Sequence, residues 1–272
     1  MALSVQNNVA AMNSYRNLSQ TQNDLSSSLE KLSSGFRINR AADDAAGLAI
    51  SEGLRSQIGG LNVAVRNAQD GISVVQTAEG ALTETHAILQ RMRDLSVQAS
   101  NTGALSDTAK TNIQAEVDEL AAGLDDIAKQ TQFNGRALLD GTYTGQTFQV
   151  GANAGEVITV NIATAMSSSG LGVDALDVVT NASTAITTLD TAIDTVSKVR
   201  AELGAKQNRL DHTINNLQVS VENLTASESR IRDTDMANEM VSYTSANILQ
   251  QAGTSMLAQA NQMPQSILSL LR

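Results

Sequence analysis

Two long segments of the chain carry an apolar residue at every seventh position. In the first half the repeat positions are Leu54, Leu61, Ala68, Val75, Leu82 and Leu89, and the apolar residues between them are Ile58, Val65 and Ile72. Those of the second half are Leu189, Val196, Leu203, Leu210, Leu217 and Leu224, with Ile186, Ile193, Ile214 and Val221. A strict seven-residue repeat predicts helices that pack along their length. Each run would form a helix of about 54 Å, so we expect the two to pack against each other.

A third helix is predicted between these two runs. Its apolar positions are Ile113, Val117, Leu120, Leu124 and Ile127. The segment 101–107 precedes this helix and supplies Gly103 for a helix end. We therefore predict that 101–107 forms the connecting turn. We therefore expect an antiparallel rod of three helices. Glu79, Arg200 and Gln207 interrupt the apolar seams, and they either fix the helix register or face solvent at the rim.

The middle of the chain changes from helical to β periodicity. Residues 147–162 alternate and are rich in Val, Ile and Thr around a Gly/Asn turn, which predicts a β-hairpin within a β region near 133–165. The small residues of 166–172 predict a flexible hinge, after which a helix should resume near Asp174. The predicted fold is mainly α: a long antiparallel helical rod or coiled-coil bundle with a small β-hairpin region, plus a terminal helix pair.

Both ends of the chain carry apolar stripes at near-heptad spacing. The N-terminal stripe comprises Val5, Val9, Met12, Tyr15, Leu18, Leu25, Leu29, Leu32 and Phe36. The C-terminal one comprises Leu249, Ala252, Met256, Ala260, Met263, Ile267 and Leu270. The rod seams already match each other, so these stripes can pair only together, and two helices leave much apolar surface uncovered. Such a patch marks an interaction site. The predicted assembly residues are Leu18, Leu25, Leu29, Leu32, Ile267, Leu268, Leu270 and Leu271.

Polar connectors separate the ends from the rod. Residues 33–47 contain Gly35, which should break a helix, and two aspartates that can cap the next one. Residues 229–240 mix Arg, Asp and Glu, and opposite charges could hold the connectors side by side. We therefore predict an assembly domain built from 1–42 and 230–272 around a rod domain of 43–229.

Composition excludes several classes of function. A net charge of −10 disfavours nucleic acid, whose phosphates would repel the chain. No apolar run approaches the 18 residues of a membrane span, and the N-terminus lacks the features of a Sec-type signal peptide. The chain has no cysteine, which removes disulfide and thiol chemistry. His86 and His212 are too far apart to suggest a metal site. We expect no catalytic, cofactor or metal residues and no enzyme activity.

Several motifs together resemble the bacterial flagellin family. They are "MALSVQNNVAAMNSYRNL", "LSSGFRINRAADDAAGLAIS", "RNAQDGISVVQTAEGAL", "LQRMRDLSVQASN", "TQFNGRALLDG", "TFQVGANAGE" and "ANQMPQSILSLLR". The resemblance implies a structural subunit that self-assembles into the flagellar filament for motility, in a minimal form without outer domains at 166–172. It also implies type III export, an extracellular location, and termini that fold on polymerisation.

Partners follow from the same resemblance. They are further copies of the chain, an export chaperone, a filament cap protein, a hook-associated junction protein and the animal Toll-like receptor for flagellin. The motif positions that imply a receptor or lateral contact are Arg91, Leu95 and Glu116. The simpler interpretation of the first two is a solvated arginine and a leucine that packs in the rod.

Two other functions stay open from the sequence. A hook–filament junction protein would share related helical ends but would cap filaments instead of extending them. A soluble coiled-coil signalling adaptor would have ordered ends and a small, defined oligomeric state.

Overall fold

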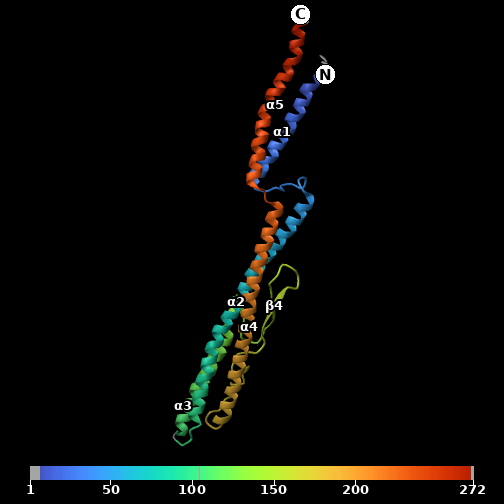
Figure 1. Cartoon of the computed structure of the whole chain (residues 1–272). Coiled ribbons are helices and arrows are strands. Elements are labelled where there is room, and N and C mark those ends of the chain that lie inside the picture. The colour runs from blue at the N-terminus through green and yellow to red at the C-terminus, as the bar shows by residue number, and fades with distance from the viewer. Residues whose placement is uncertain (1–6, 104, 271–272) are drawn as a thin grey trace. The chain divides into compact units, whose positions relative to one another are not determined.

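The computed structural model describes the backbone of residues 7–103 and 105–270, with side chains as far as residue 262. Within those ranges the chain is mainly helical, which confirms the predicted fold class (Figure 1). The helices are α1 (Val9–Ser34), α2 (Ala45–Ala99), α3 (Asp107–Gln130), α4 (Ala182–Arg232) and α5 (Met236–Leu270). The strands are β1 (Gln132–Phe133), β2 (Arg136–Ala137), β3 (Tyr143–Gln149) and β4 (Val157–Ile162).

Contacts divide the chain into two compact units. We call Met1–Ser56 with Asn223–Arg272 the terminal unit, and Gln57–Glu222 the central unit. Helices α2 and α4 contribute residues to both units. The assignment of 1–42 and 230–272 to an assembly domain, with 43–229 as a rod, stays a prediction.

The central unit is built on the predicted antiparallel arrangement of α2, α3 and α4. Arg93 of α2 donates to Asp190 of α4 (2.6 Å), and Arg200, further along α4, donates to Glu79, earlier in α2. Six of the predicted heptad residues on the two long helices are at most 1% exposed and belong to the core: Val75, Leu82, Leu89, Leu189, Val196 and Leu203. Val117 and Leu124 of α3 are equally buried and join the same cluster.

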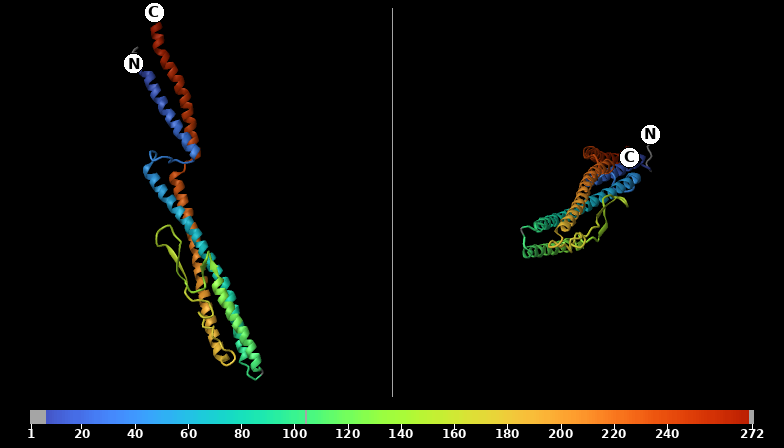
Figure 2. Two further views of the ribbon diagram at one scale, coloured as in Figure 1. Left: turned by 180° about the vertical axis from the view of Figure 1, so that it is seen from behind. Right: turned by 90° about the horizontal axis from the view of Figure 1, so that it is seen from below.

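The predicted β-hairpin is formed by β3 and β4, which pair antiparallel with Phe148 opposite Ile158. Alternate residues of β4 are buried, namely Ile158, Val160 and Ile162. The hairpin packs on the long helices of the same unit, as both views in Figure 2 show. Gly71 of α2 permits this approach, because a Cβ there would lie 3.3 Å from the Phe148 ring.

A second, shorter hairpin precedes it. Strands β1 and β2 pair across the dipeptide Asn134–Gly135, whose φ angles are 49° and 76°. Two successive positive φ angles match the type I′ turn that Asn-Gly favours. This stretch lies at the start of the predicted β region near 133–165, but a separate hairpin was not predicted there.

Segment 166–172 was expected to be a flexible hinge, and the structure shows instead a packed turn. Met166 is fully buried and Leu171 is 9% exposed. The backbone N–H and the hydroxyl of Ser168 both donate to Asp125 Oδ1 of α3, each at 2.8 Å. Small residues permit the tight turn here, while the apolar residues between them anchor it.

Helix α4 begins at Ala182 and not near Asp174 as expected. Gln114 of α3 donates to the carbonyl of Leu176 and accepts from the N–H of Val178. Asp177 accepts from the backbone N–H groups of Val179 and Thr180. These side chains satisfy backbone groups that a helix would otherwise use, so the segment stays in turns.

The hydrogen bonds between Asp125 and Ser168 lead to a prediction about stability. Hydrogen bonds from the Ser168 backbone and hydroxyl hold the pKa of Asp125 below its usual value. Asp125→Asn should lower the free energy of unfolding at pH 7 by about 1 kcal/mol. This value is low for hydrogen bonds to a charged group because the carboxylate is a third exposed to solvent.

The pH dependence of this effect follows from linkage. A lowered pKa in the folded state gives stability that is present above the unfolded pKa of about 3.9 and is lost as pH falls through the folded value. Urea unfolding followed by circular dichroism should show variant and wild type converging as pH falls from 5 to about 3. The neighbouring exposed Asp126→Asn is the control. A difference in unfolding free energy between variant and wild type that stays constant with pH would contradict this account.

Candidate assembly interface on the terminal helices

Helices α1 and α5 run antiparallel along a narrow seam in the terminal unit. Asn8, the N-cap of α1, donates to the carbonyl of Ala260 (2.7 Å). Further along, Leu18 lies so close to Gly253 that a Cβ there would be 3.2 Å from Leu18 Cδ1. Leu25 is 8% exposed in the same seam. Small residues on α5 thus let the two helices approach closely through one face of each.

Exposed large apolar side chains are concentrated on these two helices. Among the residues with described side chains, ten of the fifteen exposed large apolar ones lie on these two helices. On α1 they are Val9, Met12, Tyr15 and Leu29, and on α5 they are Met236, Met240, Val241, Ile248, Leu249 and Met256. We call these ten residues the outward apolar face. A patch of this extent marks an interaction surface.

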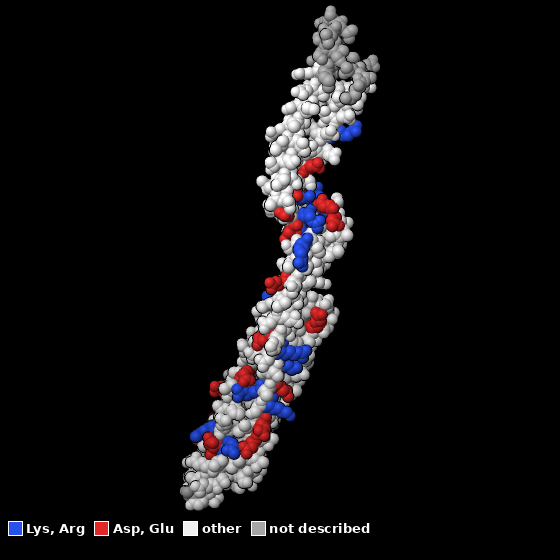
Figure 3. Space-filling model, in the orientation of Figure 1, with Lys and Arg blue, Asp and Glu red and all other residues white. Residues whose placement is uncertain are grey.

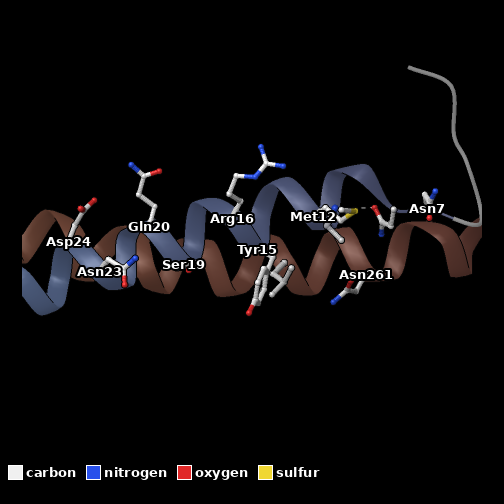
Figure 4. A pocket seen from close by; sticks show the side chains of 12 residues that line it. Asn7, Met12, Tyr15, Arg16, Ser19, Gln20, Asn23, Asp24 and Asn261 are labelled. Atoms are coloured by element: carbon white, nitrogen blue, oxygen red, sulfur yellow. Dashed lines mark hydrogen bonds between the residues drawn. The ribbon is translucent and has the colours of Figure 1, made fainter.

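Two shallow grooves lie on these helices. One, of about 460 Å³, is lined by Met240, Val241, Thr244, Ser245, Ile248 and Leu249. The other, of about 1060 Å³, follows α1 and includes Met12, Tyr15 and Leu257. Figure 4 shows this second groove, with Arg16 and Gln20 extending away from the two helices. Both grooves are open to solvent, so they suit a packed side chain better than an enclosed small molecule.

Charge is scarce on this surface. Glu239 is the single charged residue in the sequence of α5, and on the face drawn in Figure 3 the terminal helices carry few charged side chains. Mutual repulsion between copies is therefore weak along α5. No helix within residues 7–103 and 105–270 combines the length and hydropathy of a membrane span.

The connectors lie side by side, as predicted, but main-chain bonds hold them together. The N–H of Arg37 donates to the carbonyl of Arg232 (2.7 Å), and that of Thr234 donates to the carbonyl of Gly35 (3.0 Å). The Arg232 guanidinium lies 4.7 Å from the centre of the Phe36 ring and donates to Glu52 (2.8 Å). This cluster ties the ends of α1 and α4 together.

Helix boundaries in the connectors follow the sequence. Gly35, with φ of 76°, ends α1, and Asp44 caps α2 by accepting from the N–H of Gly47 (2.9 Å). Asp43 accepts from the N–H groups of Arg40 and Asn39, and these bonds lower the pKa of Asp43.

The predicted assembly residues divide between two faces of α1. Leu18, Leu25 and Leu32 are buried or half-buried, whereas Leu29 is 48% exposed. Helix α5 continues through positions 267, 268 and 270, but the side chains of Ile267, Leu268 and Leu270 lie outside the described residues, as does Leu271. Ala260, a member of the predicted C-terminal stripe, is only 6% exposed and lies in the seam. Val241 and Ile248 were not among the predicted assembly residues, although they are seven residues apart.

The proposed receptor residues do not share one environment. Arg91 of α2 and Glu116 of α3 are exposed and form an ion pair, with Nε 2.9 Å from Oε1. Leu95 is 2% exposed and lies in the core of the central unit. Its side chain therefore packs the rod, which was the simpler of the two interpretations.

Other polar residues singled out in the sequence have structural partners. Arg200 and Glu79 pair across α4 and α2 at 2.7 Å, so these two seam interruptions meet each other. His86 contacts Gln90 through Nε2 at 2.9 Å. Among the described residues, no group of three His, Asp or Glu side chains could hold a metal ion.

Comparison with known proteins identifies the family. Residues 5–144 match the family model "Bacterial flagellin N-terminal helical region", and residues 186–271 match "Bacterial flagellin C-terminal helical region". Together these matches cover most of the chain, including all of α1 and α5.

Curated relatives match over nearly their whole length. The flagellin of Bacillus subtilis (strain 168) is 52% identical over 303 residues, which covers 98% of this chain and 99% of that protein. The flagellin of Halalkalibacterium halodurans is 52% identical over 272 residues, with the same coverage. The crystal structure of Bacillus cereus flagellin is 35% identical, covers 56% of this chain and 88% of that one, and superposes with a TM-score of 0.50.

These matches confirm the resemblance found in the sequence and favour the filament subunit over the junction protein and the signalling adaptor. Flagellins are structural proteins of the filament and not enzymes. The chain is a structural subunit that self-assembles into the bacterial flagellar filament, and it belongs to the bacterial flagellin family.

Proposed function

We propose that copies of this flagellin join the filament by burying the outward apolar face of α1 and α5 against one another. The supporting observation is the exposure of Val241, Ile248 and Leu249, at 70%, 61% and 57%, in a helix with one charge. Burial of apolar surface contributes about 25 cal/mol per Å². A few hundred Å² per subunit would therefore contribute several kcal/mol, roughly what stable addition to a filament end requires.

In this proposal the seam and the outward apolar face make different contacts. Leu18, Leu25 and Leu32 hold α1 on α5, while Leu29 and the exposed residues of α5 contact other copies. Ile267, Leu268, Leu270 and Leu271 would extend the contact surface. Two helices joined through one seam are marginal alone, so the terminal unit would gain much of its order on polymerisation. Ordering that accompanies association opposes it, which keeps free subunits soluble.

We assign the remaining partners to two different surfaces. A chain secreted before assembly needs its apolar ends covered, so an export chaperone, the filament cap protein and the hook-associated junction protein would all engage α1 or α5. The Arg91–Glu116 pair is exposed on the central unit and is the proposed contact for the animal Toll-like receptor for flagellin. A lateral contact between subunits could use the same pair.

Ile248→Asp tests the outward face. The variant should remain helical and soluble, because Ile248 is 61% exposed. It should raise the protein concentration needed for seeded elongation at least about tenfold, since a charge would be buried without a partner. Light scattering and negative-stain electron microscopy measure the elongation.

Val219→Asp is the matched control for that variant. Val219 is 56% exposed and lies in the central unit, so the same chemical change should leave elongation much closer to wild type. Normal elongation of Ile248→Asp would show that the outward apolar face is not the assembly surface.

Removal of residues 263–272 tests the leucines at the end of the chain. The truncation keeps Gly253 and Ala260, so the described seam with α1 should stay intact. Circular dichroism should show a helical protein, and seeds should not elongate. Filaments of normal length from this truncation would contradict a role for Ile267, Leu268, Leu270 and Leu271.

Arg91→Ala and Leu95→Ala should separate receptor contact from packing. Loss of the exposed ion pair should change the free energy of unfolding by less than about 1 kcal/mol while weakening binding to the receptor ectodomain. Loss of the buried Leu95 side chain should instead cost about 2–5 kcal/mol. Thermal unfolding and surface-based binding assays measure the two effects. Unchanged receptor binding by both Arg91→Ala and Glu116→Ala would rule out the proposed contact.

A further inference from the structure

The methionines of this chain fall into two classes by exposure. Of the six whose side chains the structure describes, four are 48–61% exposed and two are fully buried. The exposed ones are Met12, Met236, Met240 and Met256, and the buried ones are Met92 and Met166. All four exposed thioethers lie on α1 or α5, and both buried ones lie in the central unit.

We propose that Met12, Met236, Met240 and Met256 form an oxidation site for peroxides, and that their sulfoxides block polymerisation. This inference rests on the proposed assembly surface, because all four residues belong to the outward apolar face. It adds a chemical modification that acts on the free subunit.

The reaction needs no group on the protein besides the thioether. The sulfur lone pair attacks one oxygen of hydrogen peroxide, the O–O bond breaks and an S–O bond forms. The sulfur loses two electrons to become the sulfoxide, and the second peroxide oxygen leaves as water after proton transfer. Access of peroxide to sulfur decides the rate, and exposure differs sharply between the two classes of methionine.

A sulfoxide changes the surface that must be buried. Met240 shares its groove with Val241, Ile248 and Leu249, and its oxide would place a polar acceptor among these apolar side chains. The groove also contains two hydroxyl groups, of which that of Thr244 already donates to the Met240 carbonyl (2.7 Å), so Ser245 is the remaining side-chain donor in the groove. One hydroxyl replaces only part of the hydration that a sulfoxide loses on burial, which disfavours the contact between copies.

Assembly should in turn protect these residues. Methionines covered by neighbouring copies would lose contact with solvent, whereas Met92 and Met166 are shielded in every state. Among the six methionines with described side chains, free subunits and filaments should therefore differ in oxidation at the four on the outward apolar face.

Peptide mapping by mass spectrometry tests the selectivity in the full-length protein. Free subunits treated with hydrogen peroxide should gain one oxygen at Met12, Met236, Met240 and Met256 at least about tenfold faster than at Met92 and Met166, given the near-complete burial of the latter. Preformed filaments should be oxidised more slowly at the four positions. Equal rates at exposed and buried methionines would overturn the inference.

Seeded elongation tests the consequence. Oxidised subunits should elongate seeds at least about tenfold more slowly, the factor expected from one buried polar group without a partner. Treatment with methionine sulfoxide reductases of both stereospecificities should restore elongation. A variant with leucine at the four exposed positions keeps side-chain volume and should elongate in peroxide, whereas Met92→Leu/Met166→Leu should stay as sensitive as wild type.

The outcomes separate this inference from the assembly proposal. If Ile248→Asp blocks elongation but oxidised wild type elongates normally, the assembly surface stands and the oxidation site fails. If the four-leucine variant is as peroxide-sensitive as wild type, the site again fails. If neither oxidation nor Ile248→Asp affects elongation, both proposals fail. Peptide mapping of the wild type decides the selectivity even if the four-leucine variant does not fold.

Discussion

Two helices can cover only one face of each other, and the terminal unit is organised around that constraint. The seam between α1 and α5 uses Leu18 against Gly253 and leaves Val241 and Ile248 in solvent. A third or fourth helix would be needed to bury them. In the proposed assembly, neighbouring copies of the chain supply that cover. The match to the flagellin family shows independently that the chain self-assembles into a filament.

The central unit buries its apolar helix faces within a single chain. Three antiparallel helices and a β-hairpin bury Leu82, Leu189 and Val160 almost completely. Polar contacts such as Glu79–Arg200 and Asp125–Ser168 then fix how the elements meet. The unit therefore offers copies of itself mostly polar surface. From the contrast between the two units we expect different substitutions to change stability and assembly.

Exposure also determines which methionine side chains a dissolved oxidant can reach. Met92 and Met240 are the same residue type, yet one is fully buried and the other is half exposed. Methionine is apolar and flexible, which suits a surface that packs against other molecules, but its thioether can be oxidised. The proposed oxidation site is a consequence of building the outward face with thioethers.

The sequence by itself determined the helical rod, the hairpin, the connectors and the family, because each rests on local periodicity or on a contiguous motif. Heptad spacing placed Leu82 and Leu189 in a core, and Gly35 ended a helix. Only the tertiary structure decided which side of α1 each leucine occupies, that Leu95 is buried, and that 166–172 packs instead of flexing. Those outcomes depend on neighbours distant in sequence, such as Gly253 for Leu18 and Asp125 for Ser168, and no local pattern encodes which distant residue will be the neighbour.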